Sequence, residues 1–427
     1  MNSRDSENMT ALLVKSGFLR SNTQSEANII IFNTCCVRES AEDKFFGHLS
    51  RLKPIKAKNP KLIIAISGCM SQQEEVKALI EKKYPYVDIV IGTGNRQLLP
   101  KLIWEVIETG KRFFDTSGIN DMPTSVGFDE TTRDFPHKAG INIMYGCDNF
   151  CSYCIVPYVR GRERSRALFD IYDEAKKLAD DGVKEIMLLG QNVNAYGKNQ
   201  GDESFARLVR SLSDIDKIKR IRFMTSHPRD FSEELILAIR DLPKMCKHIH
   251  LPLQAGSTRI LADMNRGYTK EDYLALVLRI KEEIPNVAIT TDIIVGYPGE
   301  TEEDFNDTLD VVKKAEFAGA FTFIYSKRSG TPAANLNCAL SGDVKSKRFE
   351  MLTNILYPIF LKFNQKKIGQ VFDVMVEENK GDGNYKGRTD DHSLVHFFAS
   401  KIFEAGDIIP IRIKDAKSFY ILGELND

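Results

Sequence analysis

The chain has 427 residues, of which 42% are hydrophobic and 28% charged, so its composition is that of a folded globular protein and not of a disordered one. Lys and Arg number 59, as do Asp and Glu, and this zero net charge excludes binding of nucleic acid through a global basic field. The sequence shows no apolar run long enough to span a membrane and no secretory signal, and its cysteines are too few for a disulfide scaffold. We therefore expect a cytoplasmic protein of about two to four domains, with no membrane association.

Residues 1–115 are predicted to form a first α/β domain. Apolar strands are expected at 27–32, 62–66 and 87–91, each followed by a helical segment. Repeated βα units imply a mostly parallel sheet with ligands at the carboxyl ends of its strands. Cys35 and Cys69 follow two of these strands on loops that are expected to be neighbours, so the two thiols either share a metal site or are buried structural cysteines.

A linker, 116–136, is predicted from its Gly and Pro content and its lack of a sustained period. In the second domain, 137–365, six apolar strands alternate with helices, at 141–144, 185–189, 220–224, 248–251, 288–295 and 320–325. Six βα units fit a partial barrel, open on one side, whose chemistry lies at the rim formed by the carboxyl ends of the strands. The polar residues that follow the strands fall on that rim: Gln191, Asn192, Asn194, His227 and Gln254.

The third domain, 366–427, changes to short alternating strands at 370–376, 384–389, 394–398, 407–414 and 419–423. Five strands in so short a segment predict a small closed β-barrel, a design often used for oligonucleotides. Because its acidic residues outnumber its basic ones, we expect it to bind RNA through one face, by stacking and shape as much as by charge. Of Phe397 and Phe398, one can offer a stacking surface while the other points into the barrel.

The most informative motif is the run Cys147, Cys151 and Cys154. Three thiolates so close together can hold three irons of a 4Fe–4S cluster and leave the fourth iron open to a small molecule. A zinc knuckle is the alternative, but it usually needs a fourth ligand, and His137 and Cys246 lie outside the run. The spacing therefore favours a cluster with one open iron.

The surrounding sequence resembles the radical S-adenosylmethionine (SAM) methylthiotransferases over essentially the whole chain. Residues 145–166 (YGCDNFCSYCIVPYVRGRERSR) are similar to the family signature, and LLGQNVNAY, HLPLQAG, MNR and TDIIVGYPGE match it at 188–196, 250–256, 264–266 and 291–300. The resemblance implies an N-terminal methylthiotransferase domain, a radical SAM domain and a C-terminal RNA-binding barrel of the TRAM type.

The resemblance also implies the reaction, the addition of a methylthio group to carbon 2 of N(6)-isopentenyladenosine beside the anticodon of tRNA. Two 4Fe–4S clusters take part: the first binds and cleaves SAM, and the second, auxiliary cluster supplies sulfur, while another SAM supplies the methyl group. The implied partners are the tRNA anticodon stem-loop and an electron donor such as flavodoxin or ferredoxin, and we expect a monomer. Two further readings stay open: action on another tRNA adenosine derivative or on a ribosomal-protein aspartate, and a non-catalytic iron–sulfur RNA-binding protein.

The family's functional residues transfer to this sequence as follows. Cys147, Cys151 and Cys154 are the implied catalytic cluster ligands, and Cys35 and Cys69 are implied ligands of the auxiliary cluster. The family's third auxiliary cysteine lies in a segment before Met1, so we expect the start to be truncated, and Cys36 is interpreted as a bystander. The SAM-contacting candidates, for which structural turns are the alternative, are Gly190, Gln191, Asn192, Gly296, Pro298, Gly299 and Glu300, together with Arg160.

Overall fold

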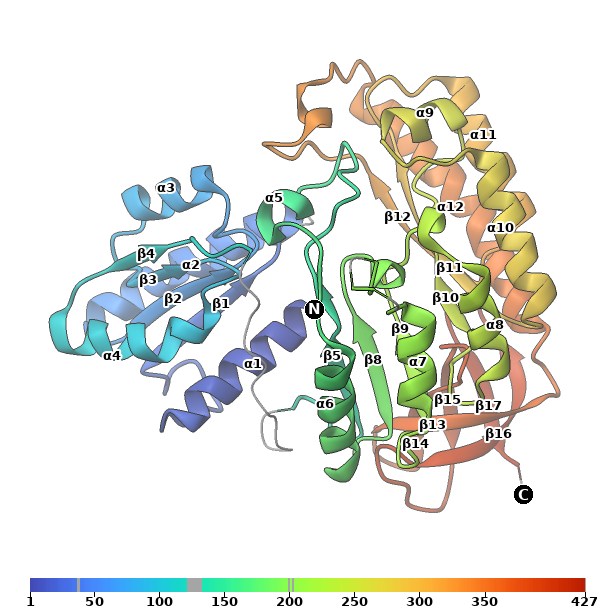
Figure 1. The fold of residues 1–427 in the computed structure, drawn as a ribbon, viewed down its shortest axis with the longest axis horizontal. Coiled ribbons are helices and arrows are strands. Elements are labelled where there is room, and N and C mark those ends of the chain that lie inside the picture. Colours follow the sequence, from blue (N-terminus) through green and yellow to red (C-terminus); the bar gives the residue numbers. More distant parts are fainter. Residues whose placement is uncertain (37–38, 121–132, 199, 202, 427) are drawn as a thin grey trace.

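The computed structural model describes residues 1–426 except 37–38, 121–132, 199 and 202 (Figure 1). The first domain is a four-stranded parallel sheet in the order β1-β2-β3-β4, and its central strand β2 is buried throughout. Its strands are β1 (Ile29–Thr34), β2 (Ile63–Gly68), β3 (Ile89–Ile91) and β4 (Phe113–Asp115), and its helices are α1 (Asn2–Lys15), α2 (Glu39–Lys58), α3 (Glu74–Lys83) and α4 (Leu99–Thr109).

The three strands predicted in this domain are present, with their bounds shifted by one or two residues. Two elements were not predicted. β4 is three residues long and too short to show a period. α1 precedes the first predicted strand. It packs Met9 into the core of the first domain, and its buried Arg4 and Asp5 pair with Glu174 and Arg160 of the second domain.

The second domain contains the six parallel strands that were predicted, in two sheets of three. A parallel bridge between Ile221 and Met245 joins the neighbouring edges, so the strands form the predicted partial (β/α)6 barrel. The strands are β5 (Lys138–Asn142), β8 (Glu185–Leu189), β9 (Arg220–Phe223), β10 (His248–His250), β11 (Ala288–Val295) and β12 (Gly319–Ile324). The outer helices are α6 (Leu168–Asp180), α7 (Phe205–Ser213), α8 (Glu233–Asp241), α10 (Lys270–Glu283) and α11 (Glu302–Ala315), followed by the long α12 (Gly342–Gln365).

Shorter elements lie at the carboxyl ends of these strands, at the top of the view in Figure 1. β6 (Met144–Tyr145) and β7 (Arg164–Ser165) pair antiparallel around the cysteine loop, and α5 (Val156–Arg160) follows that loop. α9 (Thr258–Asp263) lies after β10. The carboxyl rim is therefore built from loops and short helices, as in other barrels of this kind.

The third domain is the closed five-stranded β-barrel that was predicted, in the order β13-β14-β15-β17-β16. Its strands are β13 (Val371–Asn379), β14 (Asn384–Arg388), β15 (Leu394–Phe398), β16 (Ile408–Ala416) and β17 (Ile421–Leu425). Phe397 is 4% exposed and Phe398 is 61% exposed, so the strand alternation predicted for this pair is confirmed.

Two buried arginines of β9 fasten this barrel to the amino ends of the central strands. Arg220 donates to the carbonyls of Arg388 and Asp373 at 2.8 and 2.7 Å. Arg222 donates to the carbonyls of Asp390 and Thr389 at 2.6 and 2.7 Å and pairs with Glu185 of β8 at 2.9 Å. The small barrel and the cysteine loop therefore lie at opposite ends of the central strands (Figure 1).

None of the helices among the described residues is long and apolar enough to span a membrane. Most of the predicted linker, 121–132, lies outside the described residues.

Candidate active site

The cysteine loop joins β6 to α5 at the carboxyl rim of the partial barrel. It begins at Gly146, whose φ of +74° lies in the left-handed region. A Cβ at this position would lie 2.0 Å from the carbonyl oxygen of Arg162, so only glycine fits. The amide of Cys147 donates to the carbonyl of Gly161 at 3.2 Å, which closes the base of the loop.

The Met264-Asn265-Arg266 turn supports the loop from below. Asn265 has a positive φ of 56°, and its amide group donates to the carbonyls of Asn149 and Phe150 at 3.2 and 3.1 Å. The carbonyl of Met264 accepts from the amide of Ser152 at 3.1 Å. The MNR motif thus holds the loop through hydrogen bonds to the loop's backbone.

Arg266 is the functional residue that sequence reasoning missed. Its guanidinium is buried and donates to Cys151 Sγ at 3.3 Å and to the carbonyl of Pro252 at 3.1 Å. Its Nε donates to the hydroxyl of Tyr268 at 3.0 Å. An N–H bond to a ligand sulfur stabilises the thiolate form and helps to set the potential of a bound cluster. In the sequence, only its place in the MNR motif at 264–266 indicates a role for Arg266.

Cys147 and Cys151 are buried, and Cys154 is partly exposed. Burial, with the neighbouring Cys151, raises the pKa of Cys147 and Cys154 to about 12, so both are protonated thiols at neutral pH until a metal displaces the protons. No group of three or more His, Cys, Asp or Glu in the described part of the chain is arranged to hold a metal ion. The types of ligand atom nevertheless fit an iron–sulfur cluster, because the loop carries three thiols and an arginine N–H donates to one of their sulfurs.

The predicted SAM-contacting segments lie beside this loop. A Cβ on Gly190, after β8, would lie 2.6 Å from the side chain of Met144, just before the loop. The hydroxyl of Tyr297, in the 296–300 segment that also carries Pro298 and Gly299, is 2.8 Å from Ser152 Oγ. These positions surround the loop, and their contacts with SAM stay a prediction.

Two of the SAM-contact candidates have other partners in the structure. The Glu300 carboxylate pairs with Arg348 of α12 at 2.6 Å and accepts from the Gly296 amide at 2.9 Å. The Arg160 guanidinium does not lie free for a SAM carboxylate, because it pairs with Asp5 at 2.9 Å and donates to Cys69 Sγ at 3.0 Å. Arg160 thus belongs to the contacts of the other cysteine site.

That second site gathers Cys35, Cys36 and Cys69 at the carboxyl ends of β1 and β2. Cys36 is buried and influences the ionisation of Cys69, while its interpretation as a bystander stays a prediction. The hydrogen bond from Cys36, together with Arg160, lowers the pKa of Cys69 below that of an ordinary thiol, although burial opposes the shift. Burial alone would raise the pKa of Asp5, but Arg160 and Arg96 lower it below its usual range, so the ion pair is charged.

The two cysteine sites are neighbours. α5 begins two residues after Cys154, and its last residue, Arg160, touches Cys69. Five helical residues span only about 8 Å. The amide of Gln191 on the rim also donates to the sulfur of Met1, whose amino group interacts electrostatically with Cys69 and Cys35. The rim of the partial barrel therefore faces the cysteines of the first domain.

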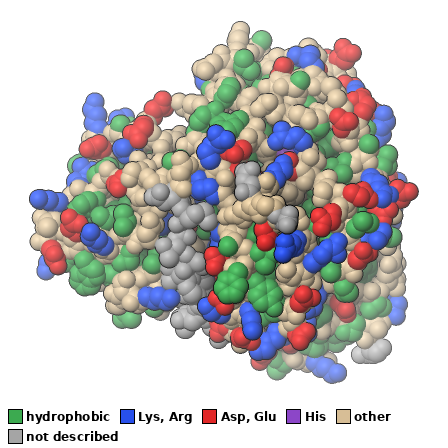
Figure 2. All heavy atoms as spheres, viewed as in Figure 1, with side chains coloured by type: hydrophobic (Ala, Val, Ile, Leu, Met, Phe, Trp, Pro, Cys, Tyr) green, Lys and Arg blue, Asp and Glu red, His purple; other side chains and the backbone are tan. Residues whose placement is uncertain are grey.

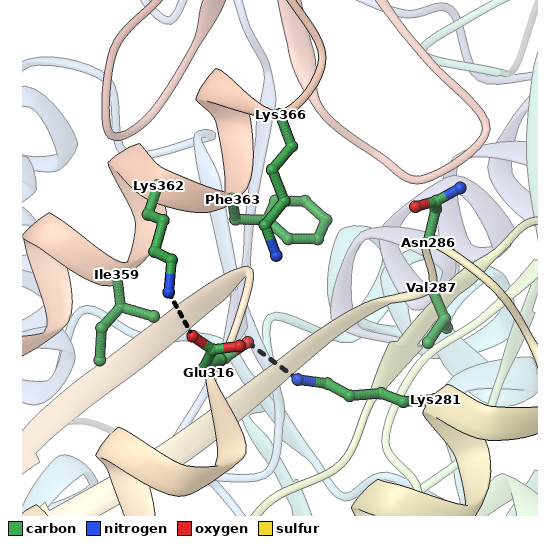
Figure 3. A pocket seen from close by; sticks show the side chains of 8 residues that line it. All are labelled: Lys281, Asn286, Val287, Glu316, Ile359, Lys362, Phe363 and Lys366. Atoms are coloured by element: carbon green, nitrogen blue, oxygen red, sulfur yellow. Dashed lines mark hydrogen bonds and ion pairs between the residues drawn. The ribbon is translucent and has the colours of Figure 1, made fainter.

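A pocket of about 200 Å³ lies away from this site (Figure 3). It is lined by residues that end α10 and α11, precede β11 or lie on α12, so it is at the amino ends of the strands. In it, Lys362 pairs with Glu316 at 2.8 Å and Lys281 donates to the Ala315 carbonyl at 2.6 Å. It is not part of the cysteine site.

Replacing Gly146 by alanine is expected to prevent the cysteine loop from closing, because the new Cβ would overlap a carbonyl oxygen. Anaerobic reconstitution should then yield about four irons fewer than in the parent protein. The matched control is Gly182→Ala: that glycine has a φ of +91° but open space around it, so only the backbone cost of about 1 kcal/mol is expected. Equal iron content in the two variants would contradict the steric argument.

Comparison with known proteins agrees with this architecture. Models of the Radical SAM superfamily, of "Uncharacterized protein family UPF0004" and of the TRAM domain match residues 141–312, 1–92 and 365–425. A Clostridium tetani protein named tRNA-2-methylthio-N(6)-dimethylallyladenosine synthase is 50% identical over 99% of this chain and 94% of its own length. The protein of the same name from Acetivibrio thermocellus is 47% identical over 100% of this chain and 88% of its own length. The chain belongs to the radical SAM methylthiotransferases.

Among solved structures, the chain is similar in fold to the radical SAM methyltransferase TsrM from Kitasatospora setae. The TM-score is 0.57 at 17% identity, over 77% of this chain and 70% of TsrM. The cobalamin-dependent SAM radical enzyme OxsB gives a TM-score of 0.52 at 12% identity, over 82% of this chain and 53% of OxsB. At these identities the similarity concerns the fold alone.

Proposed function

We propose that this methylthiotransferase adds a methylthio group to carbon 2 of N(6)-isopentenyladenosine beside the anticodon of tRNA, using SAM and two 4Fe–4S clusters. The observation that supports the proposal is the bond from Arg160 to Cys69 at 3.0 Å, because Arg160 ends the short helix that follows the cysteine loop of the rim. A sulfur source and a radical source must both reach one carbon atom, and two adjacent cysteine sites make this possible.

The cluster ligands in this proposal are Cys147, Cys151 and Cys154 at the rim, and Cys35 and Cys69 at the auxiliary site. When bound, the clusters and SAM supply the electron, the radical and the sulfur.

The protein's own residues bind and orient these groups. Gly190, which lies against Met144 just before the cysteine loop, and the Tyr297 segment would position SAM. Arg266 and Arg160 donate to the sulfurs of Cys151 and Cys69, which would hold the clusters. The substrate base must leave its stack to enter the rim, which costs a few kcal/mol and less in a loop than in a duplex.

The RNA would reach the rim across the face shown in Figure 2, where Lys and Arg side chains gather near the middle of the molecule. Arg162, Lys198 and Arg229, whose side chains are 68%, 53% and 47% exposed, lie around the site. Such cations fix the position of the RNA through its phosphates and do not read its sequence. We further propose a cytoplasmic monomer that receives electrons from a flavodoxin or ferredoxin.

The proposal is tested with protein that is reconstituted anaerobically and supplied with SAM, dithionite and an anticodon stem-loop carrying isopentenyladenosine. Mass spectrometry of the digested RNA should show one methylthio group in place of one hydrogen on that nucleoside. The control RNA carries plain adenosine at the same position and should stay unmodified. Release of 5′-deoxyadenosine without any modified nucleoside would refute the proposed substrate.

Replacing Arg160 by glutamine is expected to weaken the auxiliary site, because Cys69 loses its cationic N–H donor and Asp5 loses one of its two arginine partners. With one fewer hydrogen bond to sulfur, the potential of the auxiliary cluster should become more negative. Iron content and an electron paramagnetic resonance titration measure both effects. The control is Arg279→Gln, which removes an exposed cation paired with Glu233 and should leave iron and potential unchanged.

A further inference from the structure

Two histidine rings meet at the joint between the partial barrel and the small barrel. His248 begins β10, and His392 lies in the turn between β14 and β15. The rings lie against each other, with 5.0 Å between centroids and 30° between planes. Arg222 holds the same turn by donating to the carbonyls of Thr389 and Asp390 at 2.7 and 2.6 Å. The histidine pair therefore spans the joint that the arginines of β9 fasten.

The closed joint keeps both rings neutral. His248 is 6% exposed, and its Nε2 lies 3.1 Å from Thr290 Oγ1. His392 Nδ1 is buried and has no hydrogen-bond partner among the described residues, so a charged N–H at this atom would lack an acceptor. Burial, with Arg222, lowers the pKa of His248 to about 3 and holds the pKa of His392 well below its usual range.

The charges around the pair oppose a proton on either ring. The groups that act on the two rings are Arg222 of β9, Arg388 of β14, Lys138 of β5, Asp391 of the turn and His250 of β10. The carboxylates near these groups have partners of their own: Asp391 pairs with Lys367, Glu185 with Arg222, Glu377 with Lys138 and Asp292 with His250, while Asp390 interacts with Arg220, Arg222 and Lys247. A protonated ring would therefore add a cation beside a buried arginine without gaining a carboxylate of its own.

We propose that His248 and His392 form an acid-sensitive contact, which holds the small barrel to the partial barrel while both rings are neutral and releases it when either ring gains a proton. In the open joint each ring regains its ordinary pKa of about 6.5. The joint is therefore most stable above that pH and weakens as the pH falls below it, because the open state then binds protons that the closed state does not. In acid, the small barrel would lose its fixed distance from the cysteine loop. The inference concerns the joint alone and does not depend on the proposed function.

Hydrogen exchange tests the proposal on the anaerobically reconstituted full chain. Exchange is compared at about pH 7.5 and about pH 6.0, in peptides from 386–396 and 244–252 on the two sides of the joint, and is corrected for the pH dependence of exchange in an unfolded peptide. Between these pH values each ring should raise the population of the open joint about fourfold, so the pair should raise it roughly 15-fold. Both sides of the joint should show the rise together.

The decisive variant combines His248→Gln with His392→Asn. The Gln amide can take the place of Nε2 beside Thr290 Oγ1, and Asn tolerates the left-handed φ of 69° at position 392. Because neither replacement titrates, the rise in exchange on acidification should be roughly 15-fold smaller than in the parent protein, and about fourfold smaller in each single variant. His137, which lies beside Gly406 at another contact of the joint, also has a pKa lowered by burial. It is present in all of these proteins, so its share cancels in the comparison.

The matched control is His396→Asn. His396 lies on β15 of the same small barrel, is only partly buried and packs edge to face on Tyr420. This variant should keep the full pH dependence of the parent protein. It also shares any effect of acid on the clusters, so a difference between it and the double variant comes from the joint.

The proposal is overturned if the corrected exchange of the parent joint is the same at both pH values. It is equally overturned if the double variant keeps the parent's rise, or if His396→Asn loses as much of that rise as the double variant does. None of these measurements depends on turnover. Failure of the acid-sensitive contact would therefore leave the proposed function standing, and a protein that never modifies RNA could still show it.

Discussion

Protein carrying Cys151→Ala should cleave no SAM at all and should contain about four irons fewer than the parent protein. Cys151 is buried in the middle of the loop and receives an N–H bond from Arg266. Two remaining thiols cannot hold a cluster that leaves one iron open, so the reductive step is lost and not merely slowed. The measurement is 5′-deoxyadenosine after dithionite reduction, with iron and acid-labile sulfide determined on the same sample.

Cys246→Ala provides the matched control, because Cys246 is equally buried but lies between β9 and β10, away from the rim. Burial raises the pKa of Cys246 to about 12, so it is an inert thiol. This variant should keep its irons and its SAM cleavage. Normal cleavage by Cys151→Ala, or loss of cleavage in both variants, would show that the loop is not the cluster site.

The second large effect is expected at the joint between the two barrels. Arg222→Met leaves the Glu185 carboxylate and the carbonyls of Thr389 and Asp390 without their partner. Removing one member of a buried ion pair costs about 3–5 kcal/mol. Thermal unfolding should begin about 10 °C lower, and limited proteolysis should separate the C-terminal barrel from the rest.

An exposed arginine serves as the comparison. Arg240 on α8 pairs with Asp241 and Glu283 at the surface, and Arg240→Met should cost less than about 1 kcal/mol. If Arg222→Met unfolds like Arg240→Met, the two barrels are held together by other contacts. The same conclusion would follow if the small barrel stayed resistant to protease.

Much of the fold could be predicted because long runs of alternating strand and helix leave a strong periodic signal. The six barrel strands and the five strands of the C-terminal domain were found in this way, as were the loops that carry Cys35, Cys69 and Cys147. α1 and β4 were missed, the first because it precedes the repeating pattern and the second because three residues carry no period.

The partners of charged side chains could not be predicted. Arg160 was expected at SAM because it follows the cysteine run, but its partners lie on α1 and just after β2, far away in the sequence. Arg266 lies more than a hundred positions from Cys151, and only the folded turn after α9 brings them together. Spacing predicts ligands on one loop, whereas contacts between loops depend on the packing of the whole barrel.

The hydrogen bonds from Arg220 and Arg222 of β9 to the small barrel also limit what kind of RNA the molecule can accept. A small barrel fixed at one end of the central strands cannot swing over to the cysteine loop at the other end. An RNA held by both must therefore run along the side of the protein for the whole length of those strands. The enzyme would then select RNA by length. A hairpin too short to reach from the small barrel to the cysteine loop would lose its contacts with one of the two, whatever its sequence.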